Sequence, residues 1–349
     1  MTALKSASLD VQAGGVASTR SAAPARRRMP RVDPQSISLL AAIALLVAFV
    51  GAQEPDFFRP SNLVAIGVAV SLLGLTALPQ TALVIAGGLD ISIGAIVGLA
   101  SVACAKAASS GSALTAIVVA LSVGAAAGFL NAAIIRWGRV NPIIATLATY
   151  SAFQGVTFIV SNGNAVGVDS SFLLKLGSGK ALGLPYPLLV LIVATIAFLV
   201  VLSYTDVGRR IYAIGGNVNA ARLAGVRVSR YTLGLYALSG LIAGVAGVLL
   251  TARTGAGLPD SGAADLGLSS ITAVLLGGCA LSGGKGTITG TILGVILLGV
   301  LDNGLVLLDV EAYYQLVAKG ALLVLAVMIQ EWRNARAGRP GGLSKLVRQ

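Results

Sequence analysis

Residues 204–231 read YTDVGRRIYAIGGNVNAARLAGVRVSRY and stand between two apolar runs that are each long enough to cross a membrane. The segment carries five arginines against a single acid, Asp206. An excess of basic residues keeps a loop on the cytoplasmic side of a membrane. We therefore interpret 205–230 as a cytoplasmic loop with the character of a docking surface.

A short helix is expected inside this loop. Asn217 follows two glycines and precedes an alanine-rich stretch that ends at Gly225. Asparagine is a preferred N-cap residue, and glycine is preferred just past a helix C-terminus. The pattern predicts a capped helix from Asn217 to Ala224.

The composition is typical of a polytopic membrane protein. Only 11% of the 349 residues are charged and 56% are hydrophobic, whereas soluble domains carry about 25% charged residues. The net charge of +12 does not indicate nucleic acid as a partner, because the basic residues stand at the ends of apolar runs. Membrane lipid is the expected surrounding.

The sequence offers little for catalysis, metal binding or a cofactor, and we expect none of these. It contains no histidine, and neither paired aspartates nor a Ser–His pair suggests an intramembrane enzyme. Cys104 and Cys279 lie in apolar stretches without CxxC spacing, which favours small buried packing residues. No GxxxxGKS or GxxxxGKT motif is present, so ATP hydrolysis would need a separate subunit.

Ten apolar runs predict an all-α polytopic membrane protein with about ten transmembrane helices. They lie at 37–53, 62–86, 91–108, 113–135, 141–161, 186–204, 231–251, 268–283, 286–308 and 312–330. The basic loops 136–139 and 205–230 then share a side with both ends of the chain, so both termini are expected in the cytoplasm. The opposite loops carry these acids: Glu54, Asp56, Asp169, Asp260, Asp265, Asp309 and Glu311.

The transmembrane domain is expected over 36–331, with the loop 205–230 inside it. Residues 1–35 are rich in Ala, Ser, Arg and Pro and are expected to form a disordered basic cytoplasmic tail. Residues 332–349 form a second basic tail. A cleaved signal peptide with 37–50 as its apolar core is the alternative for the first run.

Two glycine-rich segments, near 87–94 and 277–286, are candidates for broken or re-entrant helices. The stretches TALVIAGGLDISIG (81–94) and TAVLLGGCALSGG (272–284) resemble each other, which fits either an internal duplication or chance. Irregular backbone at membrane depth must be buried in protein or line a cavity. The first segment is thus a candidate pathway wall, with Gly87, Gly88, Asp90 and Ser92.

Asp90 can cap the following helix through the amides of residues 92 and 93. We favour this N-cap at the membrane edge. The alternative is contact with a ligand or a role in gating, because an ionisable residue near hydrocarbon is usually functional.

Two further polar sets complete the candidate pathway. Asp302 and Asn303 lie in the last third of an apolar run, where a bond between Asp302 and Lys319 on the next span is favoured over substrate contact. The run that opens with Asn141 and Pro142 places three polar side chains on one broad face and turns Ser151 away from it. That face can line a cavity, although membrane hydroxyls often bond their own backbone. Its members are Thr146, Thr149 and Gln154.

Four stretches together resemble the permeases of bacterial simple-sugar, ribose-type ABC importers. They are ALVIAGGLDISIGAIVGL at 82–99, NPIIATLATYSAFQGV at 141–156, GRRIYAIGGNVNAARLAGVRV at 208–228 and LDNGLVLLDVEAYYQLVAKGALLVLAV at 301–327. The resemblance covers about 37–330.

This resemblance implies an inner-membrane permease that imports a ribose-like pentose, a hexose or a related polyol by alternating access. It implies a homodimer or close heterodimer, a cytoplasmic ATP-binding subunit and a periplasmic sugar-binding protein. It also implies that 208–228 couples to the ATPase, through Gly216, Asn217, Ala220, Ala221, Arg222 and Gly225. Ala224 stands where the family more often has serine, a change between two small residues.

Two rival functions stay open. Branched-chain amino acid ABC permeases are distant relatives of similar plan, but a zwitterion needs charges or helix ends along its path. A secondary transporter could use Asp302 as an ion site, although the arginine-rich loop argues against it.

Overall fold

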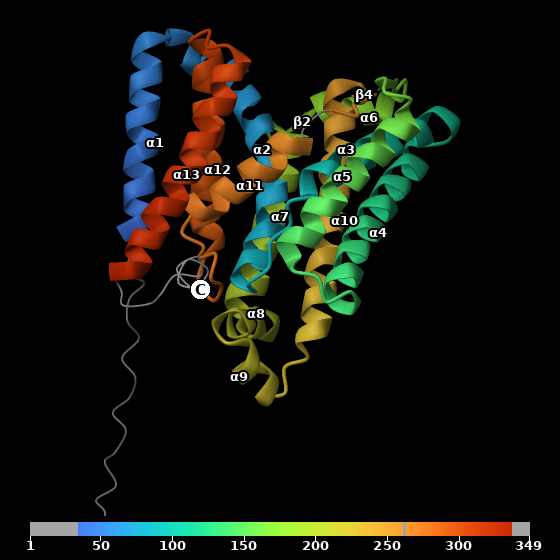
Figure 1. Cartoon of the computed structure of the whole chain (residues 1–349). Coiled ribbons are helices and arrows are strands. Elements are labelled where there is room, and N and C mark those ends of the chain that lie inside the picture. Colours follow the sequence, from blue (N-terminus) through green and yellow to red (C-terminus); the bar gives the residue numbers. More distant parts are fainter. Residues whose placement is uncertain (1–33, 261–262, 337–349) are drawn as a thin grey trace, which may run out of the picture. The chain divides into compact units, whose positions relative to one another are not determined.

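The structure is a computed structural model that describes residues 34–260 and 263–336. Within these residues the chain is largely helical (Figure 1). The elements are α1 (Pro34–Gln53), η1 (Pro55–Phe58), α2 (Pro60–Ile85), α3 (Ile93–Ser110), α4 (Ala113–Trp137), α5 (Pro142–Ser161), β1 (Val166–Gly167), α6 (Ser171–Ser178), β2 (Lys180–Ala181), β3 (Leu184–Pro185), α7 (Tyr186–Tyr204), α8 (Asp206–Gly216), α9 (Val218–Leu223), α10 (Val228–Thr254), β4 (Ala256–Gly257), α11 (Ala263–Leu276), α12 (Ile288–Leu307) and α13 (Ala312–Arg336).

Eight of these helices are long and apolar enough to cross a membrane, namely α1, α2, α3, α4, α5, α7, α10 and α12. The two other expected spans are helices with shorter apolar parts, Asp265–Leu276 in α11 and Ala312–Met328 in α13. The prediction of an all-α polytopic membrane protein is confirmed.

Two expected boundaries differ from the structure. The span expected at 268–283 is α11, which ends at Leu276, because the chain turns at Gly278 with a φ of +93° and stays non-helical up to α12. The domain end expected at 331 lies inside α13, which continues to Arg336. The tail expected over 1–35 lies outside the described residues up to 33, as does 337–349 of the second tail.

The four two-residue strands form two separate pairs. β1 pairs antiparallel with β4, and β2 pairs antiparallel with β3. These pairs tie loops between the long helices.

The buried core centres on α2, α3 and α10, which share fully buried side chains such as Leu75, Ile93 and Ala243. Here α10 runs along α4 and α3. Gly124 and Gly128 of α4 face glycines of α10. A Cβ atom added to Gly128 would lie 2.2 Å from the Tyr236 carbonyl oxygen. Small residues allow two membrane helices to approach until their backbones touch, so we call this contact the glycine seam.

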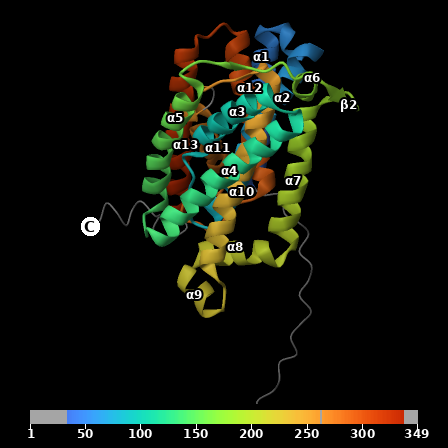
Figure 2. The same cartoon turned by 90° about the vertical axis from the view of Figure 1, so that its right-hand side faces the viewer.

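The loop between α7 and α10 folds into α8 and α9. Figures 1 and 2 both show these two short helices beyond the ends of α7 and α10, outside the long helices. The basic loop 205–230 is therefore largely helical, and we call α8 and α9 together the elbow.

Candidate functional site

The helix α8 has one buried face and one charged face. Gly208, Ile211 and Ile214 are buried, whereas Arg209 and Arg210 are exposed. The Thr205 hydroxyl accepts a hydrogen bond from the Gly208 amide at 3.4 Å. Such amphipathic patterning seats a helix on an apolar surface with its charges outward.

The helix α9 has the caps that the sequence predicts. The Asn217 Oδ1 accepts from the amides of Asn219 and Ala220, both at 3.0 Å. Gly225 lies just past the end with a φ of +81°, a conformation that glycine adopts without a steric penalty. The expected capped helix is confirmed, with its helical residues at 218–223.

The surface of α9 presents a leucine. Ala221 is buried beneath the helix, while the exposed fraction of Leu223 is 91%. Arg222 beside it is also exposed. An exposed apolar side chain next to a cation on a rigid helix is a composition suited to a protein contact. The sequence reasoning included Arg222 and Ala221 but missed Leu223.

The last turn of α8 rests on both glycine-rich breaks. A Cβ atom at Gly215 would lie 1.8 Å from the Ile85 carbonyl oxygen and 2.5 Å from the Gly284 nitrogen. The Gly284 amide in turn donates to the Ile85 carbonyl at 2.8 Å. The Tyr212 hydroxyl donates to the Gly286 carbonyl at 2.8 Å. The elbow therefore touches the end of α2 and the 277–287 segment at once.

Asp90 is the centre of the first break, and its side chain is fully buried. Its Oδ1 accepts from the Ser92 amide at 3.0 Å and from the Ser92 hydroxyl at 2.7 Å. Its Oδ2 accepts from the Ser239 hydroxyl of α10 at 2.9 Å. The expected bond from Asp90 to the amide of residue 92 is confirmed, but the N-cap residue of α3 is Ser92 rather than Asp90.

A further helix, α4, and a second residue of α10 join this network. The Asn131 amide of α4 donates to the Ser92 hydroxyl at 2.7 Å, and the Tyr236 hydroxyl of α10 donates to the Leu89 carbonyl at 2.9 Å. The first break is thus fixed by side chains from α4 and α10. Neither Asn131 nor Ser239 carries a local sequence signal that would have revealed this role.

A cavity of about 420 Å³ lies between the first break and the elbow. Its lining includes Gly87, Gly88, Pro142, Gly216, Asn217 and Tyr236. The structure thereby brings part of the predicted pathway set and part of the predicted coupling set to one cavity.

The polar face of α5 is mostly satisfied internally. The Thr146 hydroxyl donates to the Pro142 carbonyl at 2.8 Å, and the Thr149 hydroxyl donates to the Thr146 carbonyl at 3.3 Å. Asn141 caps the helix by accepting from the Ile143 amide at 2.9 Å. Ser151 is exposed, as expected, and Gln154 is partly buried. These contacts support a structural role for the two threonines.

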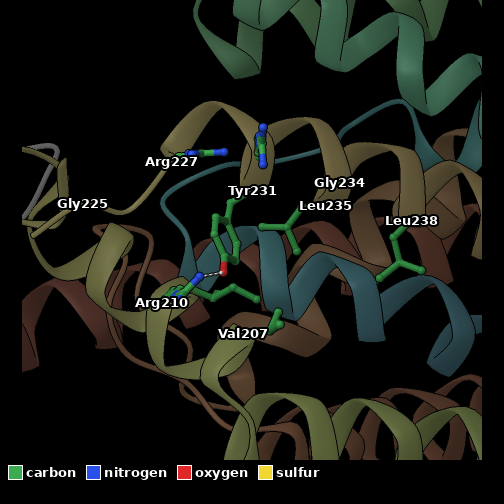
Figure 3. Close-up of a pocket in the computed structure, with 10 residues that line it drawn as sticks. Val207, Arg210, Gly225, Arg227, Tyr231, Gly234, Leu235 and Leu238 are labelled. Atoms are coloured by element: carbon green, nitrogen blue, oxygen red, sulfur yellow. Dashed lines mark hydrogen bonds between the residues drawn. The ribbon is translucent and has the colours of Figure 1, made fainter.

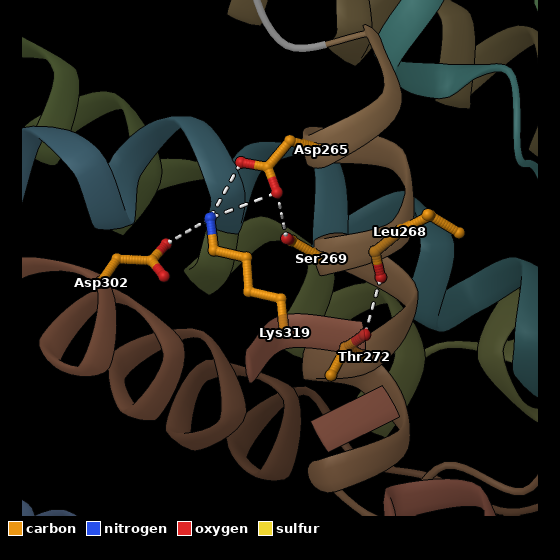
Figure 4. A network of polar contacts seen from close by, with 6 residues as sticks. All are labelled: Asp265, Leu268, Ser269, Thr272, Asp302 and Lys319. Atoms are coloured by element: carbon orange, nitrogen blue, oxygen red, sulfur yellow. Dashed lines mark hydrogen bonds and ion pairs between the residues drawn. The ribbon is translucent and has the colours of Figure 1, made fainter. Parts of the chain in front are cut away.

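Asp302 pairs with Lys319 of α13, as predicted, at 3.1 Å. The same ammonium contacts Asp265 at 3.0 Å (Figure 4). The placement of Asp265 in a loop was wrong, because it lies in the first turn of α11. This cluster joins α11, α12 and α13 through one ammonium group and two carboxylates.

Asn303 forms a reciprocal amide pair with Asn62, with nitrogen to oxygen distances of 3.0 and 2.7 Å. Asn62 stands at the start of α2, and Ile85 stands at its end. A helix rises 1.5 Å per residue, so the pair lies about 35 Å from the first break. The amide pair of Asn303 therefore lies far along α2 from Gly87 and Gly88. Asp302 lies nearer the first break through Lys319 and Asp265, because a Cβ atom on Gly267 of α11 would lie 2.9 Å from the Ile91 carbonyl oxygen.

Long apolar helices around a buried core that contains a polar network, with a helical elbow outside them, define a polytopic membrane protein. Residues 62–327 match the family described as "Branched-chain amino acid transport system / permease component", and the chain belongs to that family. Within it, the chain belongs with the ribose-type permeases of ABC importers and is a multi-pass protein of the inner membrane.

Several curated relatives are permeases named for a sugar. The ribose import permease protein RbsC of Bacillus subtilis (strain 168) is 38% identical, over 86% of this chain and 94% of the relative. The L-arabinose ABC transporter permease protein AraH of Azospirillum brasilense is 35% identical, over 83% and 86%. The D-allose transport system permease protein AlsC of Escherichia coli (strain K12) is 33% identical, over 82% and 89%. No solved structure matches the chain.

Proposed function

We propose that this chain is the transmembrane subunit of an ATP-driven importer that moves a monosaccharide into the cytoplasm by alternating access. The monosaccharide is a ribose-like pentose, a hexose or a related polyol, in keeping with the sugars named in three relatives. The subunit works with a second permease copy, a cytoplasmic ATP-binding subunit and a periplasmic sugar-binding protein.

The proposal rests on one observation: the last turn of α8 packs against both glycine-rich breaks, the one after α2 and the one after α11. A partner that moves α9 also moves α8, because Asn217 ends one helix and caps the next. The backbone contacts of Gly215 then transmit this movement to Ile85 and Gly284. Packed elements of this kind switch between discrete arrangements rather than deform continuously. The coupling residues are Gly216, Asn217, Ala220, Ala221, Arg222 and Gly225, to which we add Leu223.

The interior of the first break suits a neutral, hydroxyl-rich cargo. Its polar groups are mostly hydroxyls, amides and backbone groups, and its one carboxylate, Asp90, already accepts three hydrogen bonds. Gly87, Gly88 and Ser92 complete the pathway wall of this proposal. A secondary transporter is less well supported, since the Oδ2 atom of Asp302 already forms an ion pair with Lys319.

The variant Leu223→Glu tests the coupling surface. In proteoliposomes that hold the permease with its ATP-binding subunit and binding protein, we expect this variant to lose ATP-dependent uptake of radiolabelled ribose or allose. It should also lose co-purification of the ATP-binding subunit, while keeping its elution volume in detergent. A buried apolar anchor at a protein interface is worth about 2 kcal/mol or more.

Leu182→Asn is the matched control. Leu182 has an exposed fraction of 95%, and it lies in the β2–β3 turn at the other end of α7. Its φ of +54° is tolerated by asparagine. We expect this variant to transport normally. Wild-type uptake by Leu223→Glu, or uptake driven by an ion gradient without the ATP-binding subunit, would refute the proposed function.

A further inference from the structure

A second cavity, of about 550 Å³, opens between α8 and the start of α10 (Figure 3). Three arginines and an apolar group line it. These residues are Arg210, Arg227, Arg230, Gly234, Leu235 and Leu238. Among the residues assigned to coupling, Gly225 lines this cavity.

One end of the cavity carries the arginines, with Val207 and Ile211 of α8 beside Arg210, and the other end is apolar. Arg227 and Arg210 stand at one end and Leu238 at the other in Figure 3. Because a helix rises 1.5 Å per residue, Leu238 lies about 16 Å further along α10 than Arg227. The helix α10 runs from the basic loop into the core of the bundle, so the arginines stand at the membrane surface and the leucines lie deeper.

The positive charge of the cavity is not neutralised from within. No carboxylate is among the described residues that line it. The nearby Asp206 forms an ion pair with Arg209. The Arg210 guanidinium donates to the Tyr231 hydroxyl at 3.4 Å, and this bond, with a smaller contribution from Asp206, raises the pKa of Arg210. The cavity therefore presents a net positive charge that is complementary to an anionic ligand.

We propose that this cavity binds an anionic phospholipid of the cytoplasmic leaflet, with the phosphate at the arginines and an acyl chain along Leu235 and Leu238. The order of charge and apolar surface matches the order of headgroup and chain in a leaflet. A free phosphate would use the arginines alone, and an acidic peptide would not need apolar surface at increasing depth. The proposal does not depend on the identity of the cargo.

The test is a titration of the purified chain with phosphatidylglycerol, followed by native mass spectrometry, beside the same titration with phosphatidylcholine. We expect the anionic lipid to bind more tightly. An arginine near an anionic headgroup contributes about a fivefold change in affinity, so the double variant Arg210→Gln/Arg230→Gln should lose about 25-fold. Arg209→Gln, on the same helix but outside the cavity, is the matched control and should change affinity by less than about twofold.

A second variant fills the cavity without changing its charge. A Cβ atom on Gly234 meets nothing within 4 Å, so Gly234→Phe should fold and occupy the lipid space. Gly155 on α5 is equally open, and Gly155→Phe should bind phosphatidylglycerol as the unaltered chain does. Equal binding of both lipids, or unchanged binding by the two cavity variants, would overturn the proposal. Displacement of the lipid by millimolar inorganic phosphate would show a free-anion site instead.

Discussion

The two glycine-rich breaks begin alike and are then held by different means. After α2, the Gly87 amide donates to the Val84 carbonyl and the Gly88 amide to the Leu83 carbonyl, at 3.0 and 2.8 Å. After α11, the amides of Gly278 and Cys279 donate to Leu275 and Val274 in the same pattern, at 3.0 and 3.1 Å. Both helices therefore end in a Schellman-type turn.

The difference appears a few residues later. The first break continues into Asp90, which binds side chains of neighbouring helices. The second break has Leu281 at the corresponding position and closes on its own backbone, with the Ala280 amide donating to the Lys285 carbonyl at 3.0 Å. Three more glycines there, 283, 284 and 286, have positive φ. The first break is thus fixed mainly by buried polar side chains. The second is fixed mainly by its glycine turns, with Tyr212 as an outside donor, so the two should be sensitive to different substitutions.

The largest loss of stability is expected for Asp90→Leu. This change places in the first break the residue type that the second break has at the corresponding position, Leu281. The change leaves the Ser92 amide and the hydroxyls of Ser92 and Ser239 without their acceptor. Buried donors without partners cost 1–3 kcal/mol each, so we expect a loss of about 4 kcal/mol in the free energy of unfolding in mixed micelles. Asp90→Asn keeps an acceptor and should lose about 1 kcal/mol. Equal stability of the two variants would contradict the side-chain account of this break.

The second largest loss of stability is expected for Gly215→Ala, because Gly215 packs against both breaks. The added methyl group would lie 1.8 Å from the Ile85 carbonyl oxygen, so α8 must move away. We expect a loss of about 3 kcal/mol, at the upper end for overpacking. Gly216→Ala is the control for stability, since its Cβ atom meets nothing within 4 Å. If thermal unfolding shows the same midpoint for both variants, α8 is not seated on the breaks as described.

A third pair of variants, with smaller expected losses of stability, distinguishes backbone strain from steric contact. Gly284→Ala and Gly87→Ala both place a methyl group on a residue with positive φ, at +73° and +84°. The Gly284 methyl would also lie 2.9 Å from the Gly216 Cα atom, whereas the Gly87 methyl meets open space. We expect losses of about 2 and about 1 kcal/mol, respectively. The reverse order in a denaturant titration would mean that the first break is the more tightly packed.

The smallest expected effects come from two tyrosines, one for each break. Tyr236→Phe removes the donor to the Leu89 carbonyl in the buried network, and Tyr212→Phe removes the donor to the Gly286 carbonyl in a half-buried position. We expect losses of about 1.5 and about 0.5 kcal/mol, because an unsatisfied carbonyl costs more where water is excluded. Circular dichroism melts of the two variants give the comparison. A larger loss for Tyr212→Phe would assign the tighter hydrogen bond to the second break.

Local patterns allowed much of this fold to be predicted. The apolar runs located the long helices, and Asn217 with Gly225 located α9, because capping depends on residues a few positions apart. The Asp302–Lys319 pair was also within reach, since neighbouring spans of a bundle pack together. The end of α11 was missed because residues 279–281 are as apolar as a continuing helix.

The surroundings of Asp90 could not be predicted in the same way. Its partner Ser239 is 149 residues away in sequence, and such a contact follows from the packing of α10 on the break rather than from any spacing. Asp265 was misplaced for a related reason: a charged residue in the first turn of a short helix looks, in sequence, like a loop residue. The coupling and pathway roles of the named residues stay predictions.

The glycine seam between α4 and α10 cannot form until both helices have been synthesised. The helix α4 ends at Trp137, and its partner α10 begins at Val228, so α5 to α9 must be made before the seam can form. Ribosomes add about 5–20 residues per second, and this interval therefore lasts on the order of ten seconds. During that time the glycine face of α4 has lipid or the insertion machinery as its neighbour. Assembly of this helix pair must wait for translation, however fast the helices themselves fold.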